Sequence, residues 1–154
     1  MNESILDLMV RSQQQFASFF SIKKCYRIKA MNSKRNKDLT SEQNYILHEE
    51  GTEPAGSSPL NQEKREGDYH CVSCGTKLFS SSTKYESGSG WPSFFSSLPG
   101  VFETKTDMNA GYARTEYHCK KCGGHHGHIF DDGPKPTGKR FCNNGLCLVF
   151  KPKK

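Results

Sequence analysis

The stretch EYHCKKCGGHHGHIF, residues 116–130, contains a Cys-x-x-Cys-Gly turn, and a second such turn, CVSCG, occupies residues 71–75. Two residues between the thiolates let both sulfurs of a tight turn face one ion. The glycine that follows allows backbone N–H groups to turn toward the sulfurs. Two such turns supply the four sulfurs of a tetrahedral, closed structural zinc site. We therefore predict one structural zinc ion held by Cys71, Cys74, Cys119 and Cys122.

Other uses of paired cysteines fit this sequence less well. Disulfides suit a secreted chain, whereas no secretory signal is evident and the chain has seven cysteines, an odd number. A redox Cys-x-x-Cys is expected near a βαβ pattern, and the sequence shows none. Zinc ribbons and several binding modules share the four-cysteine plan, so the spacing by itself leaves the function open.

Short segments rich in β-forming residues surround the two cysteine turns, and Gly, Ser, Asn or Pro separate them. A helix is expected before them, with Thr40 as N-cap, Gln43 at capping-box spacing and an end near Glu50. These features, in a chain of 154 residues, predict one mainly antiparallel β domain with a short N-terminal helix. The expected strands are YHCV (69–72), KLF (77–79), GVFETKT (100–106), ARTEYHC (113–119), HIFD (128–131) and LCLVF (146–150).

The positive charge is concentrated in an N-terminal arm. Residues 1–37 hold eight of the 22 Lys and Arg and two of the 16 Asp and Glu, which leaves fourteen of each sign in residues 38–154. A neutral body argues against nucleic-acid binding, which depends on clustered Lys and Arg. No apolar run approaches the ~20 residues that span a bilayer. The arm is amphipathic over residues 4–20 and then basic, so we expect a targeting segment or a disordered extension, and a cytoplasmic or mitochondrial location.

One further cysteine has the surroundings of a reactive thiol. Cys142 stands in KRFCNNG (139–145), with Arg140 upstream and Asn143 and Asn144 downstream. A reactive cysteine needs positive charge and hydrogen-bond donors to hold it as a thiolate. His125 and His128 follow the second cysteine turn and could share a pocket if the turn between them is anchored by the zinc. A cysteine with nearby histidines and an asparagine is a plausible nucleophile with acid/base and positioning groups.

Several long motifs carry a resemblance to a known family. SGSGWPSF (87–94), the run RTEYHCKKCGGHHGHIFDDGPKPTGKRFCNNG (114–145) and LTSEQ…GTEP (39–54) resemble methionine-R-sulfoxide reductases of the B type. The resemblance covers about residues 38–151 and makes 38–154 the catalytic domain. It implies two twisted antiparallel sheets that form a β-tent or small open barrel. It also implies reduction of the R epimer of methionine sulfoxide, free or in proteins, to methionine.

The resemblance also assigns roles to residues. Cys142 matches the family's nucleophile and Trp91 matches the indole that receives the substrate's S-methyl group. His125 and His128 match the histidines that hydrogen-bond the sulfoxide oxygen and assist its protonation, with His125 the expected acid. Asn144 matches the asparagine that positions the nucleophile region. Arg140, in the same motif as Cys142, is expected on the substrate-binding side.

The expected product at Cys142 is a sulfenic acid, which thioredoxin or another thiol must reduce. Many members of the family carry a resolving cysteine where this chain has Ser89. Cys147 and Cys25 are the remaining internal candidates, and we expect Cys147 to be held in the last strand, too far from Cys142. Two further positions differ from the family pattern: His126 stands where the family usually has leucine, and Cys147 stands where it usually has a small residue.

Two other classes of function remain to be weighed. A catalytically silent, zinc-stabilised β-tent binding module would keep the cysteine turns without the reaction, but Trp91, His125, His128, Cys142 and Asn144 are all present. A nucleic-acid-binding zinc ribbon conflicts with the neutral body. We expect a monomer that uses oxidised proteins or free methionine-R-sulfoxide as substrate, with no nucleic acid and no membrane span.

Overall fold

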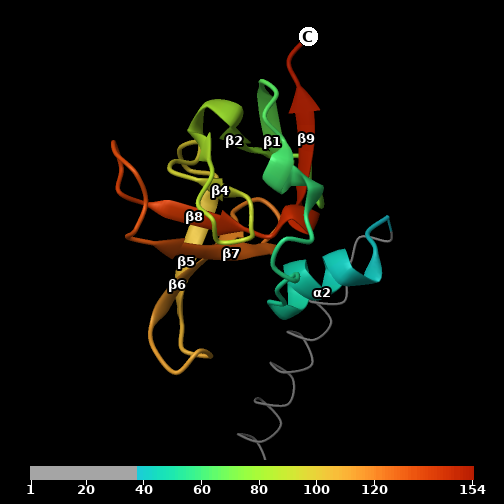
Figure 1. The fold of residues 1–154 in the computed structure, drawn as a ribbon. Coiled ribbons are helices and arrows are strands. Elements are labelled where there is room, and N and C mark those ends of the chain that lie inside the picture. Colours follow the sequence, from blue (N-terminus) through green and yellow to red (C-terminus); the bar gives the residue numbers. More distant parts are fainter. Residues whose placement is uncertain (1–37) are drawn as a thin grey trace, which may run out of the picture. The chain divides into compact units, whose positions relative to one another are not determined.

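The computed structural model describes residues 38–154 (Figure 1). The predicted amphipathic segment, the basic stretch and Cys25 fall in residues 1–37 and lie outside the described residues. Within the described part of the chain, no helix is long and apolar enough to cross a membrane.

The predicted helix is confirmed as α2 (Ser41–Glu49). The Thr40 side chain accepts from the Gln43 backbone N–H at 3.2 Å, and the Gln43 side chain accepts from the Thr40 N–H at 3.0 Å. This reciprocal capping box satisfies two N–H groups that the first turn leaves without helical partners. The helix ends at Glu50, which takes a left-handed conformation (φ 58°). Ile46 and Leu47 are the buried side chains that pack it onto the domain.

The rest of the domain is two antiparallel sheets (Figure 1). The smaller sheet has the strand order β2-β1-β9 and the larger one β3-β4-β8-β7-β6-β5. The mainly β class, the two antiparallel sheets and the single helix of the described residues are as predicted. The strands are β1 (Gly67–Cys71), β2 (Lys77–Ser80), β3 (Lys84–Tyr85), β4 (Ser93–Phe94), β5 (Phe102–Asp107), β6 (Arg114–Cys119), β7 (His125–Phe130), β8 (Arg140–Asn143) and β9 (Leu148–Pro152). Three 3₁₀ turns join them: η1 (Pro59–Gln62), η2 (Ser81–Thr83) and η3 (Gly145–Cys147).

The six expected strands are present, but their starts are not all as predicted: β7 begins at His125, three residues before its expected start, and β9 begins two residues after its expected start. Cys147 lies in the 3₁₀ turn η3, where its N–H donates to the Asn144 carbonyl at 3.1 Å, and β9 begins only at Leu148. The alternation of apolar residues did not distinguish a strand from a buried turn before it. Strands β3, β4 and β8 were not predicted. β3 and β4 have two residues each, which is too short to show a period, and in β8 (RFCN) Phe141 is the only strongly β-forming residue.

Aromatic side chains join the two sheets into one core. Phe79 of the small sheet stacks on Phe94 of the large sheet with ring centroids 4.1 Å apart, and Tyr69 meets Phe94 edge-on at 4.9 Å. Phe102 and Tyr117 continue the cluster at 4.7 Å. All but Phe102 are fully buried. Offset-stacked and edge-to-face rings stabilise a core beyond the area that they bury.

A β-bulge in β7 decides which histidines share a face. Tyr117 pairs with Gly127 and His118 pairs with His125, so His126 is an extra residue in the ladder. In a regular strand, residues three apart point to opposite faces, and the extra residue reverses that relation. The rings of His125 and His128 therefore lie 5.5 Å apart, while His126 packs in the core 5.7 Å from Phe102. A bulged strand, and not a turn, brings His125 and His128 together.

We expect Gly127→Ala to destabilise the domain by about 2 kcal/mol, the usual range for overpacking. A β-carbon at this position would overlap the carbonyl oxygen of Cys142 on the neighbouring strand. Urea unfolding followed by circular dichroism measures the loss, and the reactivity of Cys142 in the folded variant reports the shift of β8. Stability equal to that of the wild type would contradict the close approach of β7 and β8.

Candidate active site and metal centre

The four cysteines of the two turns converge on one point. Each turn closes with a backbone hydrogen bond, from Gly75 N–H to the Cys71 carbonyl at 2.8 Å and from Gly123 N–H to the Cys119 carbonyl at 2.7 Å. Both glycines have φ near +70°, a left-handed conformation that glycine adopts without a steric penalty. One turn follows β1 in the small sheet and the other follows β6 in the large sheet.

The spacing of the sulfurs fits a tetrahedral metal. The Sγ atoms of Cys71 and Cys122 are 3.7 Å apart, and those of Cys74 and Cys119 are 3.6 Å apart. A zinc–sulfur distance of about 2.3 Å gives a tetrahedron with edges of about 3.8 Å. All four ligand atoms lie within 4.8 Å of one another, and none of the four cysteines is in a disulfide. These cysteines can therefore hold a metal ion, as the sequence predicted.

A pocket of about 110 Å³ lies where β7, β8 and the segment before β4 meet. It brings Trp91 and His128 beside Cys142 and Asn144, from which both are distant in the sequence. Cys142 and His128 are direct cross-strand partners, so their side chains are neighbours on one face. The complete lining is Thr52, Trp91, Arg114, Gly127, His128, Phe130, Cys142 and Asn144.

Burial sets the protonation of the Cys142 thiol. It raises the pKa of Cys142 above the usual cysteine value, and the nearby Arg140 charge and a contact from Ser89 only partly oppose it. The Ser89 Oγ atom lies 4.0 Å from the Cys142 Sγ atom. In the free protein, Cys142 is therefore mostly a thiol near neutral pH, and the charge of Arg140 does not make it a thiolate by itself.

Arg140 does not line the pocket. Its guanidinium binds both carboxylate oxygens of Asp132, at 2.8 and 2.9 Å, and stands 4.3 Å from the centre of the Phe130 ring. The sequence motif predicts Arg140 on the substrate-binding side, whereas the pocket lining does not include it. Arg140 lies against Phe130, a residue of the pocket lining, and against the larger effect of burial it lowers the pKa of Cys142 through its charge and through a side-chain hydrogen bond.

His128 is held by an acidic partner that the sequence reasoning missed. Its Nε2 atom is 2.9 Å from Oδ2 of Asp107, which also accepts from Arg114 at 2.6 Å. The other oxygen of this carboxylate, Oδ1, accepts from the Asn109 N–H at 2.8 Å. These contacts hold the pKa of Asp107 far below its usual range. The Asn109 N–H has the largest effect, and His128 and Arg114 have smaller ones. Burial lowers the pKa of His128 against the opposing effect of Asp107, so the ring is neutral at neutral pH and donates through Nε2.

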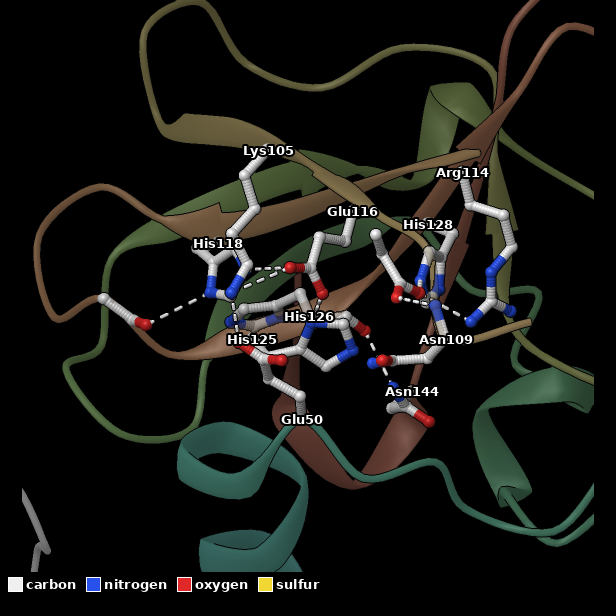
Figure 2. Close-up of polar contacts among 12 residues, drawn as sticks. Glu50, Lys105, Asn109, Arg114, Glu116, His118, His125, His126, His128 and Asn144 are labelled. Atoms are coloured by element: carbon white, nitrogen blue, oxygen red, sulfur yellow. Dashed lines mark hydrogen bonds and ion pairs between the residues drawn. The ribbon is translucent and has the colours of Figure 1, made fainter. Parts of the chain in front are cut away.

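His125 takes a different place from the one expected. It is 1% exposed and is not among the residues that line the pocket. Its Nδ1 atom lies 3.4 Å from the Glu116 carboxylate (Figure 2). Burial and the neighbouring histidines lower its pKa to about 3. Because it stands behind His128, His125 has no direct route to a molecule bound over Cys142.

Glu53 is a second residue that the sequence reasoning missed, although it stands in the quoted stretch 39–54. Its backbone carbonyl accepts from the Trp91 indole N–H, and its N–H donates to Asn144 Oδ1, both at 3.0 Å. Its buried carboxylate accepts from the N–H groups of Gly145 and Leu146. Glu53 thus fixes the indole and the segment after Cys142 on opposite sides of the pocket.

Comparisons with known proteins agree with this geometry. The SelR domain model matches residues 39–152. The chain is 48% identical over 127 residues to peptide methionine sulfoxide reductase MsrB of Leptospira interrogans, covering 82% of this chain and 97% of that protein. It is 48% identical over 130 residues to the mitochondrial methionine-R-sulfoxide reductase B2 of Homo sapiens, covering 79% and 71%. The enzyme of Methanosarcina barkeri with the same name as the first is 47% identical over 116 residues, covering 75% and 82%.

The fold, the cysteine cluster and these matches place the chain in the SelR domain family of oxidoreductases. Within it, the chain belongs with the methionine-R-sulfoxide reductases of the B type.

We expect the rate of Cys142 alkylation by iodoacetamide to rise with pH through a midpoint above the ordinary cysteine pKa of about 8.5. The reason is that burial raises the pKa of Cys142, so the thiolate forms only as the pH approaches that value. Arg140→Gln removes the opposing charge and should move the midpoint upward. Peptide mass spectrometry after timed alkylation measures the rate at Cys142.

Lys139→Gln is the matched control, because Lys139 carries the same charge one residue earlier but pairs with Asp131 at the exposed surface. It should leave the midpoint unchanged. A wild-type midpoint below neutral pH, or no shift in Arg140→Gln, would contradict this description of Cys142.

Proposed function

We propose that this domain reduces the R epimer of methionine sulfoxide, protein-bound or free, with Cys142 as the nucleophile. The observation that carries the proposal is the pocket in which the Cys142 thiol, the His128 imidazole and the Trp91 indole all face one small space. A sulfoxide has a sulfur for the thiol to attack, an oxygen for an acid to protonate and a methyl group for an apolar ring. The three side chains correspond to these three parts. The names of the family's curated members support the same reaction.

The proposed reaction balances without another reactant in its first step. The Cys142 thiolate attacks the sulfoxide sulfur, and the oxygen is protonated. This attack forms a sulfur–sulfur bond. The hydroxyl then moves from the substrate sulfur to the Cys142 sulfur, and the sulfur–sulfur bond breaks with its electron pair left on methionine, so methionine sulfoxide is reduced and Cys142 is oxidised to a sulfenic acid. One external thiol displaces water to form a mixed disulfide, and a second thiol returns Cys142 to its reduced form.

His128 is the proposed partner of the sulfoxide oxygen, in place of His125. His128 lines the pocket directly opposite Cys142, whereas His125 is buried behind it. Asp107, an anion that accepts from His128, would stabilise the imidazolium that forms when the ring takes up a proton for delivery to the oxygen. Trp91 would receive the methyl group with its ring fixed through Glu53, and Asn144 would position the segment that carries Cys142.

Zinc is the proposed ion of the four-cysteine site, and its role is structural. The sulfur spacing and the all-cysteine ligand set fit zinc in a closed site. When bound, the ion supplies a cross-link between the two sheets and no chemistry in the pocket. Metal-binding energy of this kind is also folding energy.

An external thiol, such as thioredoxin, is the proposed reductant. Ser89 occupies the neighbouring position to Cys142 but cannot form a disulfide. Cys147 is fully buried and directs its thiol to the His125 carbonyl at 3.6 Å, and burial raises its pKa well above the usual value. A protonated, buried thiol is a poor attacking group.

We also propose that the protein is a monomer and that it is located in the cytoplasm or in mitochondria.

The epimer assay tests the function. With dithiothreitol, the wild-type protein should reduce methionine-R-sulfoxide and leave the S epimer nearly untouched, measured by chromatography of the separated epimers. In Cys142→Ser the rate should fall by roughly 10⁴-fold or more, as for the loss of a nucleophile elsewhere. Cys147→Ala should stay active, since that thiol is not used. Reduction of both epimers, or an active Cys142→Ser protein, would exclude this mechanism.

A single turnover without reductant tests the recycling route. In the wild type we expect a trapped sulfenic acid at Cys142 with Cys147 still free. In Ser89→Cys we expect a disulfide between residues 89 and 142, because the present Ser89 Oγ is only 4.0 Å from the Cys142 sulfur. Mass spectrometry after thiol and sulfenic-acid trapping identifies each species, and turnover with thioredoxin should rise several-fold in this variant. A disulfide between Cys142 and Cys147 in the wild type would refute the external-thiol route.

A further inference from the structure

We propose that Glu116, His118 and His125 form a second metal site, which binds one Zn²⁺ through a carboxylate and two imidazole nitrogens. The site lies on β6 and at the start of β7, between the four-cysteine cluster and the pocket. None of its ligands is Cys142, so the inference does not depend on the proposed function. The comparisons and motifs above assign no metal to these residues.

The three side chains face one another in a geometry that suits a metal ion (Figure 2). The His118 Nε2 atom is 3.4 Å from Glu116 Oε1, and the His125 Nδ1 atom is 3.4 Å from Glu116 Oε2. All three ligand atoms lie within 4.8 Å of one another. Nitrogen and oxygen ligands about 2.0–2.1 Å from a tetrahedral zinc ion are separated by about 3.3 Å. Each histidine nitrogen stands at about this distance from a carboxylate oxygen of Glu116, Oε1 for His118 and Oε2 for His125.

The nitrogens of both rings lack hydrogen-bond partners where they face the carboxylate. His118 Nδ1 is 3.3 Å from the Gly123 carbonyl, to which it donates, and this leaves a lone pair on Nε2 toward Glu116. Metal-binding histidines commonly donate their other N–H to a backbone carbonyl in this way. His118 Nε2 and both nitrogens of His125 make no hydrogen bond, although His125 is 1% exposed. Buried polar atoms are normally satisfied, and a cation between the rings and the carboxylate would satisfy these.

The first cysteine turn gives an internal comparison. Asp68, His70 and Cys71 stand in the same order as Glu116, His118 and Cys119, and His70 likewise contacts the carbonyl of its turn glycine, Gly75, at 3.0 Å. The residue paired with His70 is Lys77, whose ammonium binds Asp68 at 2.8 Å. The residue paired with His118 is His125. In the first hairpin, the position opposite the histidine therefore carries a cation, Lys77. In the second hairpin, the same position carries a potential metal ligand, His125.

Lys105 is the group that an arriving metal ion must displace. Its ammonium lies 2.9 Å from Glu116 Oε1 and also pairs with the Glu50 carboxylate (Figure 2). Lys105 belongs to the edge strand β5 and its side chain is 51% exposed, so it can turn into solvent at little cost. Its departure would free Glu50, at the end of α2, to complete the coordination directly or through water.

Zinc titration of the folded, zinc-loaded protein tests the proposal. Calorimetry and metal analysis should show one equivalent of Zn²⁺ in the four-cysteine site and a second, exchangeable equivalent. His118→Leu should weaken the second equivalent by roughly 100-fold or more, since it removes a direct ligand. Lys105→Met should tighten it, because the competing ammonium is gone. Absence of a second equivalent in the wild type, or its persistence in His118→Leu, would overturn the proposal.

Two controls separate this site from other zinc-binding groups. His70→Leu changes the equivalent histidine of the first hairpin and should retain the second equivalent. Cys142→Ser should also retain it, and loss in this variant would mean that the ion binds the reactive thiol instead. Cobalt substitution gives a further readout: the second equivalent should lack the strong thiolate-to-metal absorption of the four-cysteine site. Thiolate absorption from the second equivalent would refute the proposed ligands.

Discussion

The convergence of four cysteines from two different sheets is the constraint on which the other features of this domain depend. One pair belongs to the turn after β1 and the other to the turn after β6, and their sulfurs meet at distances of 3.6–3.7 Å. The cluster fixes the ends of both hairpins, and the stack of Phe79 on Phe94 fixes the sheets farther along. A small β domain with this modest core gains much of its definition from such a cross-link. The place where β7 begins, and therefore the position of its histidines, follows from the second turn.

The pocket is then built by pairing and by one irregularity. β7 and β8 run side by side with Gly127 close to the Cys142 backbone, and the bulge at His126 turns His125 and His128 to the same side. His128 thereby reaches the pocket, while His125 lies against Glu116 one layer behind. Glu53, from the segment after α2, ties Trp91 to Asn144 across the pocket. The side chains that line the pocket come from separate segments, and buried hydrogen bonds hold them in one geometry.

The electrostatics of the site are governed by burial more than by formal charge. Arg140 stands near Cys142, yet Asp132 neutralises it and the pKa of Cys142 is still raised. The same loss of hydration lowers the pKa values of His125 and His128. Each of these neutral imidazoles stands beside a carboxylate. The His128–Asp107 pair suits proton transfer to a substrate, and the His125–Glu116 pair suits a metal ion. Glu116 lies close to both histidines, so an ion bound by Glu116 would lie near the pocket that contains Cys142.

The sequence by itself determined the features that local spacing encodes. The two Cys-x-x-Cys-Gly turns predicted the metal site, the Thr40–Gln43 pair predicted the capped helix, and the motifs around Trp91 and Cys142 predicted the family. Only the tertiary structure decided the neighbours of each side chain. The short strands β3, β4 and β8 form by pairing with neighbouring strands of the larger sheet, and the sequence showed no periodic pattern that predicted them. The bulge turned His125 and His128 to one side, and His128 but not His125 lines the pocket. Asp107 and Glu53 joined the site through contacts with distant segments, and Cys147 lies in a buried turn. These outcomes depend on packing between residues far apart in the chain, which spacing along the sequence does not contain.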